Sequence, residues 1–301
     1  MINITHKSST LRKAIAQAIV CVSKPETILA VKNRTVPKGD VLEMAKTAGL
    51  FAAKRTADMI PDCHPLPIEF TAVSYEIGEM EIQIVVEIHT IYKTGVEVEA
   101  MHAASVVALT MYDMLKPIDK GISIQHIKLL EKRGGKSDQK SDFSKLKAAV
   151  VVCSDSISQG KGEDKSGKVI IGKLENLGVQ VLNYVVIPDD SDQIQSTAHD
   201  AVAQGMDILI YTGGTGLSPR DITPESLLPI LTRRVPGIEE AIRSYGQQRV
   251  PTAMMSRSVA GTIGKMLVLA LPGSAAGAGE SMDAVFPAVF HVFPVLAGAR
   301  H

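Results

Sequence analysis

The stretch GGKSDQKSDFSKLKAAVVVC, residues 134–153, decides how the chain is organised. Its first part, 134–147, is polar and charged and nearly devoid of apolar side chains, which is typical of a linker between domains. Its last part, 148–153, is a short continuous apolar run, as expected of a parallel strand that is buried on both faces. We therefore predict a first domain over residues 1–137, a linker over 138–147 and a second domain over 148–301.

Composition and charge describe an ordinary globular protein. The chain has 301 residues, 45% of them hydrophobic, and at about 150 residues per domain this length suits two domains. The formal net charge is zero, and residues 1–140 hold 18 Lys and Arg against 16 Asp and Glu, so neither half predicts a nucleic-acid partner. Three distant cysteines, Cys21, Cys63 and Cys153, give no disulfide framework and predict a cytoplasmic protein. No apolar run is long enough to predict a membrane span.

The first half has the pattern of an α+β domain. Ala-rich segments with apolar residues at helical spacing predict helices over 38–60 and 98–115. Two runs joined by a short turn predict an antiparallel hairpin of strands over 68–77 and 80–88, and a last strand covers 122–130. We expect the helices to pack on one face of the sheet.

The second half alternates strands and helices, which predicts a doubly wound, Rossmann-like α/β domain. The expected strands are 148–153, 179–187, 208–212 and 266–271, and the expected helices are 168–177, 191–204 and 281–296.

Four loops at the carboxyl ends of these strands are rich in glycine, serine and aspartate, and such loops form the ligand site of this fold. Glycines let backbone N–H groups approach phosphate oxygens, and carboxylates there hold Mg²⁺ or act on a substrate hydroxyl. The pattern therefore favours a nucleotide with a metal ion, although the glycines could also form a tight turn and the acids could cap helices. The candidate residues are Ser154, Asp155, Asp189, Gly213, Gly214, Thr215, Gly216, Asp221 and Ser274.

The motifs SDSISQGKGEDKSG (154–167), IPDD, TGGTGLSPRDITPE (212–225) and LPGS resemble the molybdopterin-binding adenylyltransferase family. The resemblance implies that Asp189 and Asp221 serve as catalytic acids in the transfer of AMP from ATP to molybdopterin. It also implies Mg²⁺ bound with ATP, with Asp221 as a metal ligand, no tightly bound cofactor, and a trimer. The alanines that follow Ser274 depart from the family pattern, so a non-catalytic pterin-binding or scaffold module is the alternative.

Charged residues of the first half also form a candidate site. Carboxylates, a histidine and lysines suit acid–base chemistry on a phosphorylated substrate, because lysine binds phosphate as a point charge. Each residue also has a simpler interpretation, as a complement to a helix end or as a surface ion pair. The candidate residues are Lys38, Cys63, His64, Glu97, Glu99, Asp113, Lys116 and Lys132.

The stretches 38–67, 93–121 and 127–137 resemble cyclic pyranopterin monophosphate synthase, with a ferredoxin-like fold and a hexamer whose active sites lie at subunit interfaces. The resemblance implies conversion of (8S)-3',8-cyclo-7,8-dihydroguanosine 5'-triphosphate to cyclic pyranopterin monophosphate and diphosphate, without a metal ion. It makes Asp113 and Lys116 the proton-moving pair. It places Lys38 and Lys132 against the triphosphate, with help from Arg12. It implies that His64, Glu99 and the Cys63 backbone bind the base of the substrate. Asp62 and Val98 depart from the family pattern at the edge of this substrate site.

Together these features predict a bifunctional protein that acts at two non-consecutive steps of molybdenum cofactor biosynthesis. The expected small-molecule partners are the cyclised guanosine triphosphate derivative, molybdopterin and ATP, and the expected assembly is a homo-hexamer. An unrelated nucleotide-binding module is the alternative for the first half.

Overall fold

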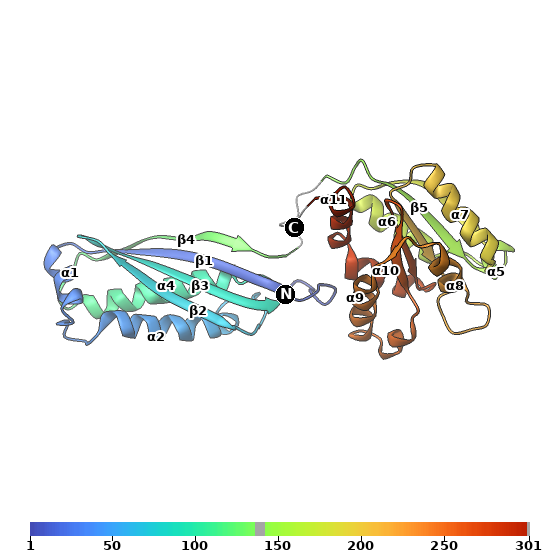
Figure 1. Ribbon diagram of the computed structural model, residues 1–301. Helices are drawn as coiled ribbons and strands as arrows, with labels where there is room; N and C mark the ends of the chain where they lie inside the picture. Colours follow the sequence, from blue (N-terminus) through green and yellow to red (C-terminus); the bar gives the residue numbers. More distant parts are fainter. Residues whose placement is uncertain (136–141, 300–301) are drawn as a thin grey trace. The chain divides into compact units, whose positions relative to one another are not determined.

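The computed structural model describes residues 1–135 and 142–299, and the chain divides into two compact units, Met1–Gln139 and Lys140–His301 (Figure 1). The predicted end of the first domain at 137 and the first part of the predicted linker lie outside the described residues. The rest of that segment belongs to the second unit. The ring of Phe143 lies 4.1 Å from that of Phe290, measured between centroids, and Lys147 already begins a strand.

The first unit is built on a four-stranded antiparallel sheet in the order β2-β3-β1-β4. The sequence patterns missed β1, which lies near the centre. Its buried positions are Ala14, Ala16, Ala18 and Val20, and such small side chains give a weak hydrophobic signal. The strands are β1 (Thr10–Cys21), β2 (Phe70–Ile77), β3 (Glu81–Tyr92) and β4 (Ser123–Arg133).

Helices α2 (Val41–Lys54) and α4 (Glu97–Leu115) lie side by side on one face of this sheet (Figure 1). The carboxylate of Asp40 accepts hydrogen bonds from the first N–H groups of α2 and so sets its start. The predicted helix over 38–60 is in fact two helices, because α2 ends at Lys54 and α3 (Thr56–Met59) follows. Helix α1 (Pro25–Lys32) was not predicted.

The second unit has a six-stranded sheet in the order β6-β5-β7-β10-β9-β8, in which β6, β5, β7 and β10 are parallel and β9 pairs antiparallel with both β10 and β8. The four predicted strands are present, and β8 and β9 were missed. The strands are β5 (Lys147–Cys153), β6 (Gln180–Ile187), β7 (Ile208–Thr212), β8 (Arg233–Arg234), β9 (Val259–Ile263) and β10 (Met266–Leu271).

Helices cover both faces of the second sheet, as expected of a doubly wound fold. One face packs against α6 (Ser166–Asn176), α9 (Pro236–Gln247) and α10 (Ala275–Val285), and the other packs against α7 (Ser191–Ala203) and α8 (Thr223–Leu227). The strand order reverses at β5, whose neighbours are β6 and β7. Loops that leave the carboxyl ends of these strands therefore form the expected ligand site.

The predicted helix over 281–296 is wrong. Helix α10 ends at Val285, Pro287 follows, and the chain continues as the short helices η4 (Ala288–His291) and α11 (Val292–Leu296). Proline has no backbone N–H and disfavours helical geometry in the residue before it, so the apolar pattern continues while the helix does not. The other short helices are α5 (Asp155–Ser158), η2 (Leu228–Ile230) and η3 (Pro251–Met255). Among the described residues, no helix is both long and apolar enough to span a membrane.

The contact between α2 and α4 gives a stability prediction. A Cβ added at Gly49 would overlap Cγ2 of the fully buried Val107 on α4. We expect Gly49→Ala to lower the free energy of unfolding of the first unit by about 1–3 kcal/mol, because the packed helices must separate. Gly172→Ala on α6 is the control: nothing lies within 4 Å of its added Cβ, and it should stabilise by about 0.5–1 kcal/mol. Amide hydrogen exchange reports each unit separately, and equal effects of the two variants would contradict the prediction.

Candidate active sites

Three predicted residues meet at the end of α4. The carboxylate of Asp113 accepts hydrogen bonds from Nζ of Lys38 and Nζ of Lys116, each at 2.7 Å, and Lys38 also donates to the backbone oxygen of Asp113 at 2.9 Å. The two lysines lower the pKa of Asp113 to about 2, and the aspartate raises the pKa of Lys116. In this arrangement Lys116 is a proton donor and Asp113 an ionised acceptor. The simpler interpretation of Asp113 and Lys116 as an exposed ion pair is compatible with the same geometry.

A second group lies at the start of α4. Glu99 is 2% exposed, its Oε1 accepts the Cys63 thiol at 3.0 Å, and its Oε2 is buried without a partner. Burial raises the pKa of the Glu99 carboxyl, with a further contribution from the nearby charge of Glu97. Burial and the contact with Glu99 raise the pKa of Cys63 to about 12, so the thiol stays protonated and is a poor nucleophile at neutral pH. In this group, the unpartnered Oε2 of Glu99 is therefore the atom available to bind a ligand.

The residues around this group are more exposed. Nε2 of His64 lies 2.7 Å from the backbone oxygen of Ile2. Asp62 and Val98, the two departures from the family pattern, both expose their side chains to solvent.

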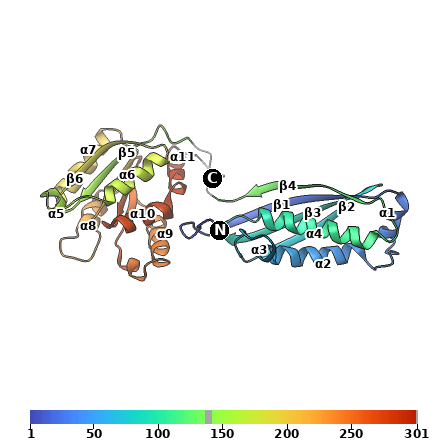
Figure 2. The same cartoon turned by 180° about the vertical axis from the view of Figure 1, so that it is seen from behind.

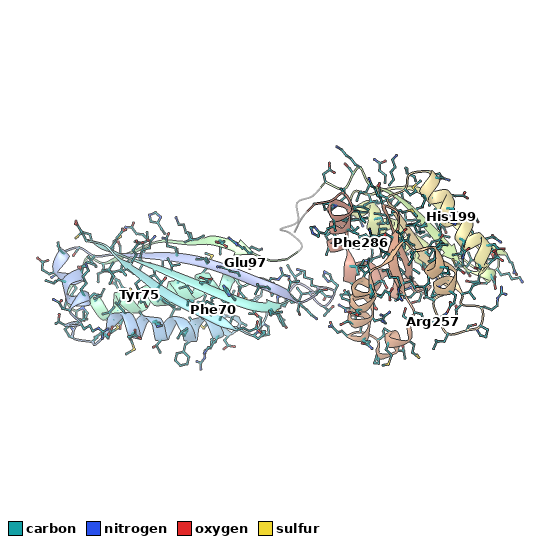
Figure 3. All side chains as sticks on the ribbon, in the orientation of Figure 1. Phe70, Tyr75, Glu97, His199, Arg257 and Phe286 are labelled. Atoms are coloured by element: carbon teal, nitrogen blue, oxygen red, sulfur yellow. The ribbon has the colours of Figure 1, made fainter. Side chains whose placement is uncertain are left out.

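Glu97, which is labelled in Figure 3, forms an ion pair with Lys132. A cavity of about 340 Å³ opens beside these two residues. Arg12 also lines this cavity, and its Nε donates to the backbone oxygen of Tyr92 at 3.3 Å. Two further lysines of the wall, Lys7 and Lys93, were not predicted as site residues, because only the folded chain brings them together with Arg12 and Lys132. Four cationic side chains around one carboxylate make the cavity suitable for a polyanion. The cationic wall consists of Lys7, Arg12, Lys93 and Lys132.

These two groups do not meet within one chain. Glu99 and Asp113 are 14 residues apart on the same helix, which at 1.5 Å per residue separates them by about 21 Å. Figure 2 shows α3, which precedes Cys63, at one end of the unit and α1 at the other. The structure therefore brings Cys63, Glu97, Glu99 and Lys132 to one end, and Lys38, Asp113 and Lys116 to the other.

In the second unit, loops after β5 and β6 bring two predicted acids together. The backbone N–H of Asp155 donates to Oδ2 of Asp189 at 3.2 Å, and the N–H of Asp189 donates to Oδ1 of Asp155 at 3.1 Å. Oδ1 of Asp189 is buried without a partner, and burial raises the pKa of this carboxyl, with contributions from the charges of Asp155 and Asp221. Asp190, and not Asp189, caps α7 by accepting from the N–H of Gln193. Asp189 therefore does not cap α7: its Oδ2 accepts from the first N–H of α5 (Asp155–Ser158), and its Oδ1 has no such role.

The glycine loop after β7 closes directly on Asp189. Gly213 and Gly214 have positive φ angles of 101° and 62°, a conformation that glycine adopts at little cost. A Cβ at Gly214 would lie 2.8 Å from Oδ1 of Asp189. The hydroxyl of Thr223 donates to the backbone oxygen of Gly213 at 3.0 Å and fixes the loop to the start of α8. Thr215, in the same loop, is buried.

The loop continues to Asp221, whose Oδ2 accepts from the N–H of Ser218 at 2.8 Å and lies 2.8 Å from a Cβ added at Gly216. Arg220 forms an ion pair with Asp155, so one cation faces the acids of this cleft. Arg257, which the sequence analysis did not single out, donates through Nε to the backbone oxygen of Gly216 at 2.7 Å.

Two predicted serines cap helices, which is the simpler role considered above for polar residues of these loops. Oγ of Ser154 accepts from the N–H of Ile157 at 3.4 Å, and Oγ of Ser274 accepts from the N–H of Gly277 at 3.1 Å. Ser274 also lines a cavity of about 270 Å³. The loop that carries Ser274 abuts the glycine loop, because a Cβ on Gly273 would lie 3.0 Å from Cα of Gly213.

The buried Glu99 predicts a pH dependence of stability. Because burial raises its pKa in the folded state, it favours folding below its ordinary pKa of 4.5, and this contribution is lost as the pH rises through the folded-state pKa. We expect Glu99→Gln to remove that loss, so that the free energy of unfolding of the first unit at pH 7 minus that at pH 4 is more positive in the variant than in the unaltered protein. Hydrogen exchange at pH 4 and pH 7 measures the free energy of unfolding of each protein. Any cost of the Gln side chain that does not depend on pH cancels when the two values are subtracted. A variant as pH-dependent as the unaltered protein would contradict the prediction.

Comparison with known proteins identifies both units. Residues 1–135 match the MoaC family, and residues 149–291 match the family described as a probable molybdopterin binding domain. The chain is 49% identical over 139 residues to the cyclic pyranopterin monophosphate synthase of Pelobacter propionicus, a match that covers 46% of this chain and 86% of the relative.

Two relatives match along the entire chain. The molybdenum cofactor biosynthesis bifunctional protein of Chlorobaculum tepidum is 40% identical over 301 residues, which covers 100% of this chain and 96% of the relative. The protein of the same name in Synechococcus elongatus is 35% identical over 315 residues, which covers 100% and 98%. Because both family models and the full-length relatives agree, the chain belongs to the family of bifunctional molybdenum cofactor biosynthesis proteins.

Proposed function

We propose that the first unit is a cyclic pyranopterin monophosphate synthase. It would convert (8S)-3',8-cyclo-7,8-dihydroguanosine 5'-triphosphate to cyclic pyranopterin monophosphate and diphosphate. The single observation that carries this proposal is the cavity in which Lys7, Arg12, Lys93 and Lys132 surround the carboxylate of Glu97. The identity to a named synthase supports it independently.

The residues divide the chemistry between them. Lys132 and the other cations of the cavity bind the phosphates, because each contributes a charge that a polyphosphate requires. Glu99 and the backbone near Cys63 receive the base, which supplies the partner that Oε2 of Glu99 lacks. Lys116, protonated beside Asp113, donates a proton to the substrate. Lys38, which the resemblance places against the triphosphate, binds Asp113 in this structure and would hold it in place.

This assignment requires a second copy of the chain. The proton donor and the base-binding group stand about 21 Å apart on one helix, which is too far to act on one small molecule. We propose that the donor end of one copy completes the base-binding end of another, within a hexamer. The trimer expected for the second unit shares its threefold symmetry with such a hexamer.

Mixed oligomers test this arrangement. Lys116→Ala and Lys132→Ala remove exposed lysines at opposite ends of the unit, and each variant alone should lose most pterin formation. If the two variants are unfolded, mixed in equal amounts and refolded together, about one quarter of the paired half-sites are intact. The mixture should recover about that fraction of activity, measured as cyclic pyranopterin monophosphate released.

The control for mixed oligomers is each variant refolded alone at the same total concentration. A mixture no more active than these controls, with light scattering showing that mixed oligomers form, would contradict a shared site.

We infer that the second unit binds molybdopterin and transfers AMP to it from ATP. The observation that carries this inference is the contact of Gly214 with the unpartnered oxygen of Asp189, which joins a phosphate-binding loop to an available carboxylate. The N–H groups of residues 214–216 would donate to phosphate oxygens, whereas that of Gly213 already donates to the backbone oxygen of Leu271. Arg220 is a cation close to the acids. Asp189 fits a Mg²⁺ ion that enters with ATP, and Asp221 would be its second ligand. When bound, the metal ion neutralises phosphate charge.

A variant of Asp221 distinguishes an enzyme from a binding module. The full chain supplied with molybdopterin and Mg-ATP should form adenylylated molybdopterin, and Asp221→Ala should reduce the rate by about 100-fold or more, because it removes charge from the reaction centre. Molybdopterin binding, measured by fluorescence, should persist.

Asp192→Ala, which removes an exposed acid on the neighbouring α7, is the matched control and should retain the rate. If the unaltered chain binds molybdopterin but forms no adenylylated product, the second unit is a binding or scaffold module.

A further inference from the structure

Arg257 lies far from the glycine loop in the sequence but is bound to it at several points. It belongs to the segment between η3 and β9, and Figure 3 labels it on the side of the unit where the loop before α8 lies. Its guanidinium donates through Nε to the backbone oxygen of Gly216 at 2.7 Å and through Nη2 to that of Asp221 at 2.6 Å. Its third nitrogen, Nη1, forms an ion pair with Glu225 of α8. Its backbone N–H donates to the oxygen of Thr215 at 3.1 Å.

These bonds hold both ends of the exposed loop that spans residues 217–220. The chain from 217 to 220 projects into solvent, with Leu217 69% exposed. Within it, the N–H of Asp221 donates to the oxygen of Ser218 at 2.9 Å, and the carboxylate of Asp221 accepts from the N–H of Ser218. The turn 218–221 therefore moves as one piece, and Arg257 anchors it on both sides.

The geometry requires a guanidinium. Two backbone oxygens and one carboxylate, from three positions of the chain, each take a different nitrogen. Arginine presents its N–H groups in a rigid planar fork, whereas the lysine ammonium is a single point that cannot reach all three acceptors. Arg257 is 30% exposed, so these bonds are only partly screened by water.

We propose that Arg257 is the positioning residue that holds the Asp221 carboxylate at the correct place beside Gly216 and Asp189. This proposal rests on the AMP transfer proposed above. None of the described contacts of Arg257 is with the Asp221 carboxylate itself, so Arg257 acts through the backbone of the loop. Its loss should therefore slow the reaction step more than it weakens the binding of ATP.

The test uses the full chain with Arg257→Lys and Arg257→Ala. We expect kcat for AMP transfer to fall by about 10- to 100-fold, since displacement of a reacting group by about 1 Å has effects of that size, while KM for ATP changes by less than threefold, or about 0.65 kcal/mol. Millimolar guanidinium should restore part of the rate of Arg257→Ala.

The matched control is Arg249→Lys in the same unit. The guanidinium of Arg249 donates to the backbone oxygen of Tyr245 at 2.7 Å and lies over the ring of Tyr245. The kcat of Arg249→Lys should be unchanged.

Hydrogen exchange separates this proposal from the proposed function. In Arg257→Ala, amides of residues 213–221 should exchange faster and be protected again by guanidinium, while amides of β7 and α7 stay unchanged. If the unaltered chain forms no adenylylated product, the proposed function fails and exchange alone decides whether Arg257 holds the loop.

Unchanged exchange in residues 213–221 would overturn the proposal, as would a rise in KM for ATP at constant kcat, which would show direct substrate binding. If Arg257→Ala does not fold, Arg257→Lys is judged by the same two measurements.

Discussion

The length and rigidity of α4 control how the first unit can work. This helix of 19 residues packs its alanine-rich face against the small buried residues of β1, and the close contact at Gly49 fixes α2 beside it. Small side chains let the elements approach closely, so the helix is held along its whole length. It carries Glu99 in its first turn and Asp113 in its last. The same packing that stabilises the unit therefore divides its charged residues between two ends.

The two candidate sites differ in how they treat their carboxylates. Asp113 is exposed between two lysines and stays ionised, whereas Glu99 and Asp189 each keep one oxygen buried without a partner and have raised pKa values. An unsatisfied buried oxygen costs stability that a ligand can recover by supplying the missing partner. This cost is a physical reason to place the ligands of both units at Glu99 and Asp189 and to give Asp113 a role in proton transfer.

The second unit builds its cleft from segments that come together only at the edge of the sheet. The reversal of strand order at β5 brings the loops of β5, β6 and β7 together, and the positive φ angles of Gly213 and Gly214 let that loop lie against Asp189 without a side chain between them. Arg257 belongs to the segment before β9. It binds the loop that follows β7, although β10 lies between β7 and β9 in the sheet. The backbone around the acids of this cleft sets their separation.

The sequence by itself determined the two-unit organisation and the parallel strands and named most of the candidate residues, because apolar runs, glycine loops and family motifs are local patterns. It did not reveal β1, whose small buried residues give little hydrophobic signal, or the end of α10 before Pro287. Lys7, Lys93 and Arg257 were missed because their roles depend on neighbours distant in sequence. Only the tertiary structure decided which charged residues from distant parts of the chain meet. The ion pair of Lys132 with Glu97 and the bonds of Arg257 to the loop of Asp221 depend on how the strands and helices pack.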